Sequence, residues 1–321
     1  MSINLTIEEL KTEIKKVKPD IKESSLTAYV NQLSKLKSLF NAKNYDFILE
    51  PEDVYKKLDE SVNSDLTKKN YITPIMVLLR TQGDKYKDLI ETYNKKIKSI
   101  SENYSKQNKE GVISEKQKPN FISYAELEKY IKKIKKDITP LKKATFITSQ
   151  DRDLFQIYMM LEFLIRYPLR NDLSGMKLLT KTEFNKLKEK TENYLVKEKN
   201  KMIVYLYEYK TNKTYSEIKF EIDKSMKTIF NMYIKRLDLK NGDYLLQQVR
   251  EKSLPLSRNK LSQMLINNSQ KYIGKNISTN IIRKIVVSHK FSDYKDEQEL
   301  LAGIMGHDVV TQNKIYVKKS I

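Results

Sequence analysis

The feature that most constrains the fold is a polar stretch, residues 101–120, that follows a region of helical periodicity. Before this stretch, apolar side chains recur every three or four residues, which is the spacing of one helix face. The stretch itself reads SENYSKQNKEGVISEKQKPN and is nearly free of large apolar residues. Such a composition is typical of a linker between domains. We therefore predict a helical domain over residues 1–100, a linker over 101–120 and a second domain over 121–321.

Helix-start signals support the first of these domains. Thr6 followed by Glu9 forms a capping box, in which each residue satisfies a backbone N–H of the other, and it predicts a helix to about Val17. The apolar residues that follow at helical spacing predict a bundle. Its further helices are expected over residues 24–40, from Glu50-Pro51, and over residues 64–81.

The second domain is predicted to be mostly helical with a few strands. Ser123 and Glu126 form another capping box, and residues 151–166 are strongly amphipathic. The segments MIVYLYEY (202–209) and YSEIKFEI (215–222) are rich in Val, Ile, Tyr and Phe and predict a β-hairpin. The fold class is therefore mainly α (α+β) with a small antiparallel sheet. Further helices are predicted over residues 225–237, 258–272, 278–287 and 296–306.

The charge balance points to a polyanionic partner. The chain has 61 Lys and Arg against 41 Asp and Glu, a net charge of +20, spread over its whole length. A basic surface of this kind is the electrostatic footprint of a nucleic-acid-binding protein. The alternative is a set of solvated Lys-rich helices in a chain where Lys, Asn, Ile and Tyr are all abundant. Charge alone leaves both interpretations open.

Composition also excludes several kinds of site. The chain has no cysteine and two histidines, so disulfides and thiolate metal sites are absent and a zinc site is not expected. No stretch reaches the ~18 apolar residues of a membrane span, and the N-terminus lacks the apolar region of a signal peptide. We therefore expect a soluble, intracellular protein that needs no metal and no small-molecule cofactor.

The last part of the chain, GIMGHDVVTQNKIYVKKSI, carries the most specific motif. It contains His307 and, after a polar run, Tyr316 within Ile-Tyr-Val. Taken singly, His307 could cap the preceding helix and Tyr316 could be a core residue. Their order resembles the C-terminal box of the tyrosine recombinases, in which Leu-Gly-His precedes a tyrosine nucleophile. A phenol can form a covalent phosphotyrosyl bond without metal, and a nearby imidazole can neutralise charge on the attacked phosphate.

A second match lies after the amphipathic segment 151–166. Tyr-Pro-Leu-Arg-Asn-Asp resembles the first arginine box of this family, and Arg170 matches its arginine. Asp172 departs from the usual spacing, since it follows Arg170 by two positions where the family's acidic residue comes three after its arginine. The same residues also resemble the variant found in integrases of large DNA viruses and virophages. The fixed fork of a guanidinium can bind two oxygens of one phosphate.

A lysine in the predicted hairpin matches the next catalytic position. The family carries a lysine in a β-hairpin turn with the pattern Gly-Lys-Gly-x-Lys, and Lys210 in Tyr-Lys-Thr-Asn-Lys matches the first lysine. The resemblance implies that Lys210 is the general acid for the departing 5′ oxygen. The glycines of the pattern are missing here. Lys213 is the alternative, and both could be ordinary turn lysines.

Asn-Ile-Ile-Arg resembles the second arginine box, and Arg283 matches its arginine. Three positions earlier, where the family usually has His or Lys, this chain has Asn280. An amide can donate a hydrogen bond to a phosphate but cannot accept a proton at neutral pH, so general-base assistance to Tyr316 is not expected from Asn280. We interpret His289, on the same predicted helix, as structural.

The order Arg170, Lys210, Arg283, His307, Tyr316 is that of the family. The resemblance implies a site-specific recombinase or integrase that acts through a 3′-phosphotyrosyl intermediate without metal or ATP. Its implied partner is double-stranded DNA, on which a monomer forms dimers and tetramers. If the source is a virus, the host cytoplasm or nucleus is the expected location. A type IB topoisomerase and a DNA-binding protein with impaired catalysis remain alternatives.

Overall fold

The computed structural model describes residues 2–109, 113–115, 117–215, 217–248, 251–305 and 309–311. The chain divides into two compact units, Met1–Ile113 and Ser114–Ile321. His307 and Tyr316 lie outside the described residues. Each unit is described by itself.

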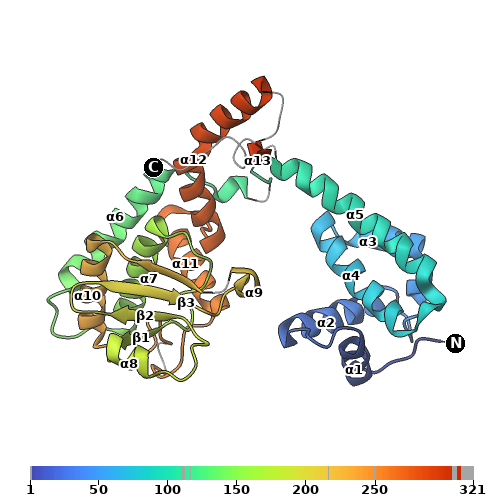
Figure 1. The fold of residues 1–321 in the computed structure, drawn as a ribbon, viewed down its shortest axis with the longest axis horizontal. Helices are drawn as coiled ribbons and strands as arrows, with labels where there is room; N and C mark the ends of the chain where they lie inside the picture. The colour runs from blue at the N-terminus through green and yellow to red at the C-terminus, as the bar shows by residue number, and fades with distance from the viewer. Residues whose placement is uncertain are drawn as a thin grey trace. The chain divides into compact units, whose positions relative to one another are not determined.

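The first unit is a helical bundle built around α4 (Asp65–Thr81). Seven residues of α4 are buried, and the helix packs against α1, α2 and α5 (Figure 1). The capping box predicted at Thr6 and Glu9 is present at the start of α1. The remaining helices are α1 (Ile7–Val17), α2 (Glu23–Leu39), α3 (Pro51–Ser61) and α5 (Lys87–Lys109), with short 3₁₀ turns η1 (Asp46–Leu49) and η2 (Asp84–Tyr86).

Residues 101–109, which the polar composition assigned to the linker, are helical. They are the last turns of α5, whose residues Tyr93, Ile97 and Ile100 pack against the core of the first unit. A helix anchored by such an apolar face can continue through the polar residues that follow it. The division between the two units falls after Ile113, which lies within residues 101–120.

The second unit is organised around α7 (Ser149–Arg166). Ten residues of α7 are buried, and the helix packs against α6, α10, α11 and α12. The predicted Ser123–Glu126 capping box starts α6. The longer helices are α6 (Tyr124–Leu141), α10 (Lys224–Leu237), α11 (Arg258–Ile273) and α12 (Thr279–Ile304); the short ones are η3 (Lys118–Asn120), α8 (Lys181–Lys186), α9 (Asn212–Tyr215) and α13 (Val309–Thr311).

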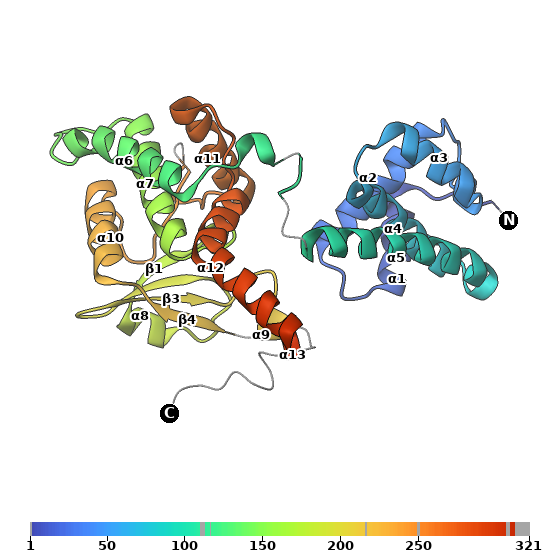
Figure 2. The same ribbon diagram turned by 90° about the horizontal axis from the view of Figure 1, so that it is seen from above.

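A four-stranded sheet covers one side of these helices (Figure 2). Its order is β1 (Lys177–Thr180), β2 (Tyr194–Lys197), β3 (Met202–Leu206) and β4 (Ile218–Glu221). Alternate residues such as Leu195 and Val204 join the helical core, whereas Val196 and Tyr205 form a smaller cluster with Phe184 of α8. Both faces of the central strands are therefore covered.

The predicted mainly α fold with a small sheet is confirmed, and so is the pairing of the predicted hairpin strands. β3 and β4 are antiparallel, with Leu206 opposite Ile218. The prediction of a purely antiparallel sheet was wrong, because β1 and β2 pair in parallel. Neither β1 nor β2 was predicted from the sequence, and each is four residues long. Their pairing arises only through tertiary contacts.

Candidate active site

Arg170 lies on the loop that follows α7. Pro168 stops the helix, because the residue before a proline is forced toward extended backbone, and Tyr167 has φ −123° and ψ 85°. The Tyr167 hydroxyl donates to Asp223 Oδ2 (2.9 Å) and accepts from the Asp223 backbone N–H (2.7 Å), which ties the loop to the start of α10. Arg170 itself is exposed. The hydrogen bonds of Tyr167 therefore fix the start of the loop, while the side chain of Arg170 is exposed.

Arg283, on α12, is brought to the same loop. Its Nε donates to the carbonyl of Pro168 at 2.8 Å, across 115 residues of sequence. Burial lowers the pKa of the Arg283 guanidinium and the neighbouring Arg170 charge lowers it further, while Asp172 opposes both. The two arginines predicted from separate motifs therefore lie close enough to repel each other. Two adjacent guanidinium groups can together bind an anion.

A buried carboxylate lies beside the arginines. Asp172 is 5% exposed, and burial raises the pKa of its carboxyl. The Arg258 guanidinium, the Arg170 backbone N–H and the charges of Arg170 and Arg283 act in the opposite direction. Arg258, the first residue of α11, is a third arginine that the sequence analysis did not identify. The only local signal for it was its position after Ser257, which caps α11.

Asn193 joins the arginine loop to the end of β3. Its side chain is 2% exposed, and Nδ2 donates to the carbonyls of Asp172 (2.9 Å) and Glu208 (3.0 Å). Its Oδ1 accepts from the backbone N–H groups of Tyr207 and Glu208, both at 3.0 Å. All four bonds go to main-chain atoms, so Asn193 fixes two chain segments against each other. Nothing in the sequence singled out this residue.

We expect Asn193→Ala to lower the free energy of unfolding of the second unit by about 3 kcal/mol, because it leaves two backbone N–H groups and the Asp172 carbonyl without partners. Urea denaturation followed by circular dichroism measures this loss. Asn200→Ala, in the exposed turn between β2 and β3, is the matched control and should change stability by less than ~0.5 kcal/mol. An unchanged urea midpoint for Asn193→Ala would contradict this role.

Lys210 lies in the connection between β3 and β4, ahead of α9. It is exposed, and it follows by two positions the Glu208 residue that Asn193 and Arg258 contact. The turn between β2 and β3 carries Lys199 and Lys201 and lies at the opposite end of β3. There Lys201 pairs with Glu198 (3.8 Å) and Glu221 (3.9 Å). Lys210 is therefore at the end of the sheet that adjoins the arginines.

Asn280 lies in the first turn of α12 and is exposed. Residues three apart on a helix are neighbours, so Asn280 and Arg283 share one face. His289, further along α12, stacks its ring on Tyr124 of α6 with centroids 4.0 Å apart. This contact gives His289 a packing partner on another helix.

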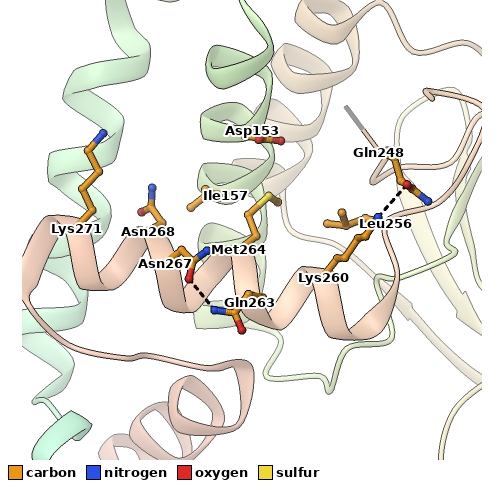
Figure 3. Close-up of a pocket in the computed structure, with 10 residues that line it drawn as sticks. All are labelled: Asp153, Ile157, Gln248, Leu256, Lys260, Gln263, Met264, Asn267, Asn268 and Lys271. Atoms are coloured by element: carbon orange, nitrogen blue, oxygen red, sulfur yellow. Dashed lines mark hydrogen bonds between the residues drawn. The ribbon is translucent and has the colours of Figure 1, made fainter. Parts of the chain in front are cut away.

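The cavity of about 570 Å³ along α11 contains none of the predicted site residues. Figure 3 shows Ile157, Leu256 and Met264 as its apolar lining, with Lys260 bonded to Gln248 (3.1 Å) at one end. Asp153 is the one carboxylate among the residues drawn. Arg170 and Arg258 lie outside this cavity, and both are exposed.

Within the described ranges, no group of three or more His, Asp or Glu side chains is arranged to hold a metal ion. No helix in the same part of the chain is long and apolar enough to cross a membrane.

No family model and no curated protein matches the chain. Among solved structures, a XerA recombinase is similar with a TM-score of 0.36 and 12% identity, covering 98% of this chain and 94% of that one. A XerH site-specific recombinase, described as bound to difH substrate in a pre-cleavage complex, has a TM-score of 0.36 and 14% identity, covering 99% and 97%. At this level of similarity neither match assigns an activity to this chain.

Proposed function

We propose that this chain is a site-specific DNA recombinase of the tyrosine recombinase type. The observation that carries the proposal is that Arg283 donates to the Pro168 carbonyl, two residues before Arg170, and that the charges of the two arginines interact. These two arginines were selected by separate motifs. The lysine selected by a third motif, Lys210, lies at the adjoining end of the sheet. The net charge of +20 supplies the long-range attraction to DNA.

In the proposed reaction, the Tyr316 oxygen attacks a backbone phosphorus and forms a 3′-phosphotyrosyl bond. The bond to the 5′ oxygen breaks, and Lys210 gives that oxygen a proton. The phenolic proton leaves to solvent, because Asn280 cannot accept it at neutral pH. Arg170, Arg283 and His307 neutralise the charge on the phosphate oxygens, and Asn280 donates a hydrogen bond to them. The adduct keeps the bond energy, so a 5′ hydroxyl can reverse the step without ATP.

The N-terminal unit is then the DNA core-binding domain and the C-terminal unit the catalytic domain. The protein is a monomer in solution and forms dimers and tetramers on DNA. The residues Pro-Leu-Arg-Asn-Asp around Arg170 favour the integrase variant of large DNA viruses and virophages. A stable tetramer without DNA, seen by light scattering, would contradict the assembly part of the proposal.

The decisive experiment is incubation of the wild type with supercoiled plasmid in EDTA, followed by denaturation to detect protein bound covalently to DNA. An adduct supports the proposal, and its absence on both plasmid and the termini of the source element contradicts it. Relaxation of an arbitrary plasmid with turnover would favour a type IB topoisomerase. DNA binding without any adduct would favour a binding protein with impaired catalysis.

Lys210→Ala is expected to slow adduct formation by about 10²–10⁴-fold, the usual contribution of a general acid. Replacing the 5′ bridging oxygen of the DNA by sulfur should restore most of the rate, because a thiolate leaves without needing a proton. Rates on the two substrates are measured under single-turnover conditions.

Lys199→Ala is the matched control, since this exposed lysine belongs to the turn at the other end of β3. It should react at the wild-type rate on both substrates. Lys213→Ala tests the alternative general acid in the same way. A sulfur rescue seen for Lys213→Ala or Lys199→Ala, and not for Lys210→Ala, would overturn the assignment.

A further inference from the structure

Arg258 uses only part of its hydrogen-bonding capacity. Its Nη2 contacts the carbonyl of Glu208 (3.3 Å) and Glu208 Oε1 (3.4 Å) and lies 3.9 Å from Asp172 Oδ1. Within the described part of the chain, its Nε and Nη1 donate no hydrogen bond. A guanidinium has five N–H groups in a rigid fork. Arg258 therefore keeps donors available for a further acceptor.

The backbone that carries Arg258 is fixed to the arginine loop. Asn171 Nδ2 donates to the Arg258 carbonyl (3.0 Å), and Ser174 Oγ donates to the Leu256 carbonyl (2.7 Å). The start of α11 therefore cannot shift without moving the loop that carries Arg170. Arg170, Arg258 and Arg283 all act on the same buried carboxyl of Asp172, which places three cations around one anion. The cluster retains an excess of positive charge.

Asp172 and Glu208 both hold Arg258 weakly, for different reasons. Asp172 is buried and already accepts the backbone N–H of Arg170, and its distance from Arg258 is at the outer limit of an ion pair. The side chain of Glu208 is 65% exposed and that of Arg258 is 44% exposed. An exposed pair of this kind contributes little, so another anion can replace Glu208 at small cost.

We propose that Arg258 is a third phosphate-binding arginine of this site, and that a DNA backbone phosphate displaces Glu208 from its guanidinium. In the free protein Glu208 compensates the charge that Arg258 adds beside Arg170 and Arg283. On DNA, the unused N–H groups of Arg258 form a two-point contact with phosphate oxygens. This inference rests on the proposed DNA-processing function and adds a residue that no motif indicated.

The test measures equilibrium binding of a short duplex DNA to the full chain at several salt concentrations, in a Tyr316→Phe background so that all binding is non-covalent. Arg258→Ala should weaken binding about tenfold and reduce the slope of log K against log salt by ~0.9, the loss of one phosphate contact. Arg258→Lys should keep the slope. Glu208→Gln should tighten binding about threefold, because the competing carboxylate is gone.

Lys240→Ala is the control, since this exposed lysine pairs with Asp238 away from the arginine loop. It should change affinity less than about twofold. An unchanged salt slope for Arg258→Ala, or weaker binding by Glu208→Gln, would overturn the inference. If Arg258→Ala does not fold, Glu208→Gln decides alone, and binding that is not tightened counts against the inference.

The outcomes separate this inference from the proposed function. DNA binding that does not depend on Arg258, together with adduct formation by the Tyr316-containing protein, removes only the inference. Binding that depends on Arg258 without any adduct removes only the strand-cleavage chemistry. A chain that fails to bind duplex DNA removes both.

Discussion

A Tyr316→Phe variant is expected to form no covalent adduct with DNA while binding the same duplex as tightly as the wild type. Phenylalanine keeps the ring and removes the one oxygen that can attack phosphorus in the proposed reaction, so the loss should be complete rather than partial. The adduct is measured with a duplex nicked near the cleavage site. The short fragment that carries the new 5′ hydroxyl then diffuses away, so it cannot reverse the step and the intermediate is trapped. Denaturing electrophoresis then shows the protein on the DNA.

The matched control is Tyr294→Phe. Tyr294 is 65% exposed on α12, so it is a tyrosine with an accessible phenol in the same region of the sequence. Its replacement should leave both adduct formation and DNA binding unchanged. An adduct formed by Tyr316→Phe would show that another residue is the nucleophile, and mass spectrometry of the DNA-linked peptide would identify it.

Removing either predicted arginine is expected to slow adduct formation by about 10²–10³-fold at saturating DNA, the usual cost of losing one donor to a developing phosphate charge. Arg170→Ala and Arg283→Ala should show this effect at saturating DNA, where weaker binding no longer limits the rate. Arg170→Lys and Arg283→Lys should recover only part of the rate, since an ammonium lacks the two-point fork. Single-turnover rates measure the chemical step.

Arg80→Ala is the control, because this exposed arginine lies on α4 in the other unit. At saturating DNA this variant should form the adduct at the wild-type rate. Thermal melting of each variant separates chemistry from folding. Arg283→Ala loses the bond to the Pro168 carbonyl and should melt a few degrees lower. Arg170 has an exposed side chain, so Arg170→Ala should melt as the wild type does. A rate unchanged by either substitution would contradict the proposed site.

Asn280 imposes a further limit on the chemistry. It lies on the face of α12 that carries Arg283, so it can contribute a hydrogen bond but no general base. In the proposed reaction, solvent therefore removes the phenolic proton of Tyr316. The rate of adduct formation should then increase with pH over the neutral range, because solvent removes the phenolic proton more readily.

The sequence by itself determined much of the local structure. Capping residues and apolar spacing depend on neighbours a few positions away, which is why the helix starts at Thr6 and Ser123 and the buried face of α7 were predictable. The β3–β4 pairing was predictable because both strands are rich in β-branched and aromatic residues. Motif order also selected Arg170, Lys210 and Arg283. Local composition did not indicate that residues 101–109 continue α5, because packing of the helix against the core of the first unit is a tertiary effect.

Only the tertiary structure decided which groups meet. The bond between Arg283 and the Pro168 carbonyl, the four bonds of Asn193, and the position of Arg258 between Asp172 and Glu208 join segments from different parts of the chain. Asn193 and Arg258 belong to no periodic pattern and no motif. The buried amide of Asn193 and the half-exposed guanidinium of Arg258 each lie where several backbone segments come together. These segments are close to one another only in the folded chain.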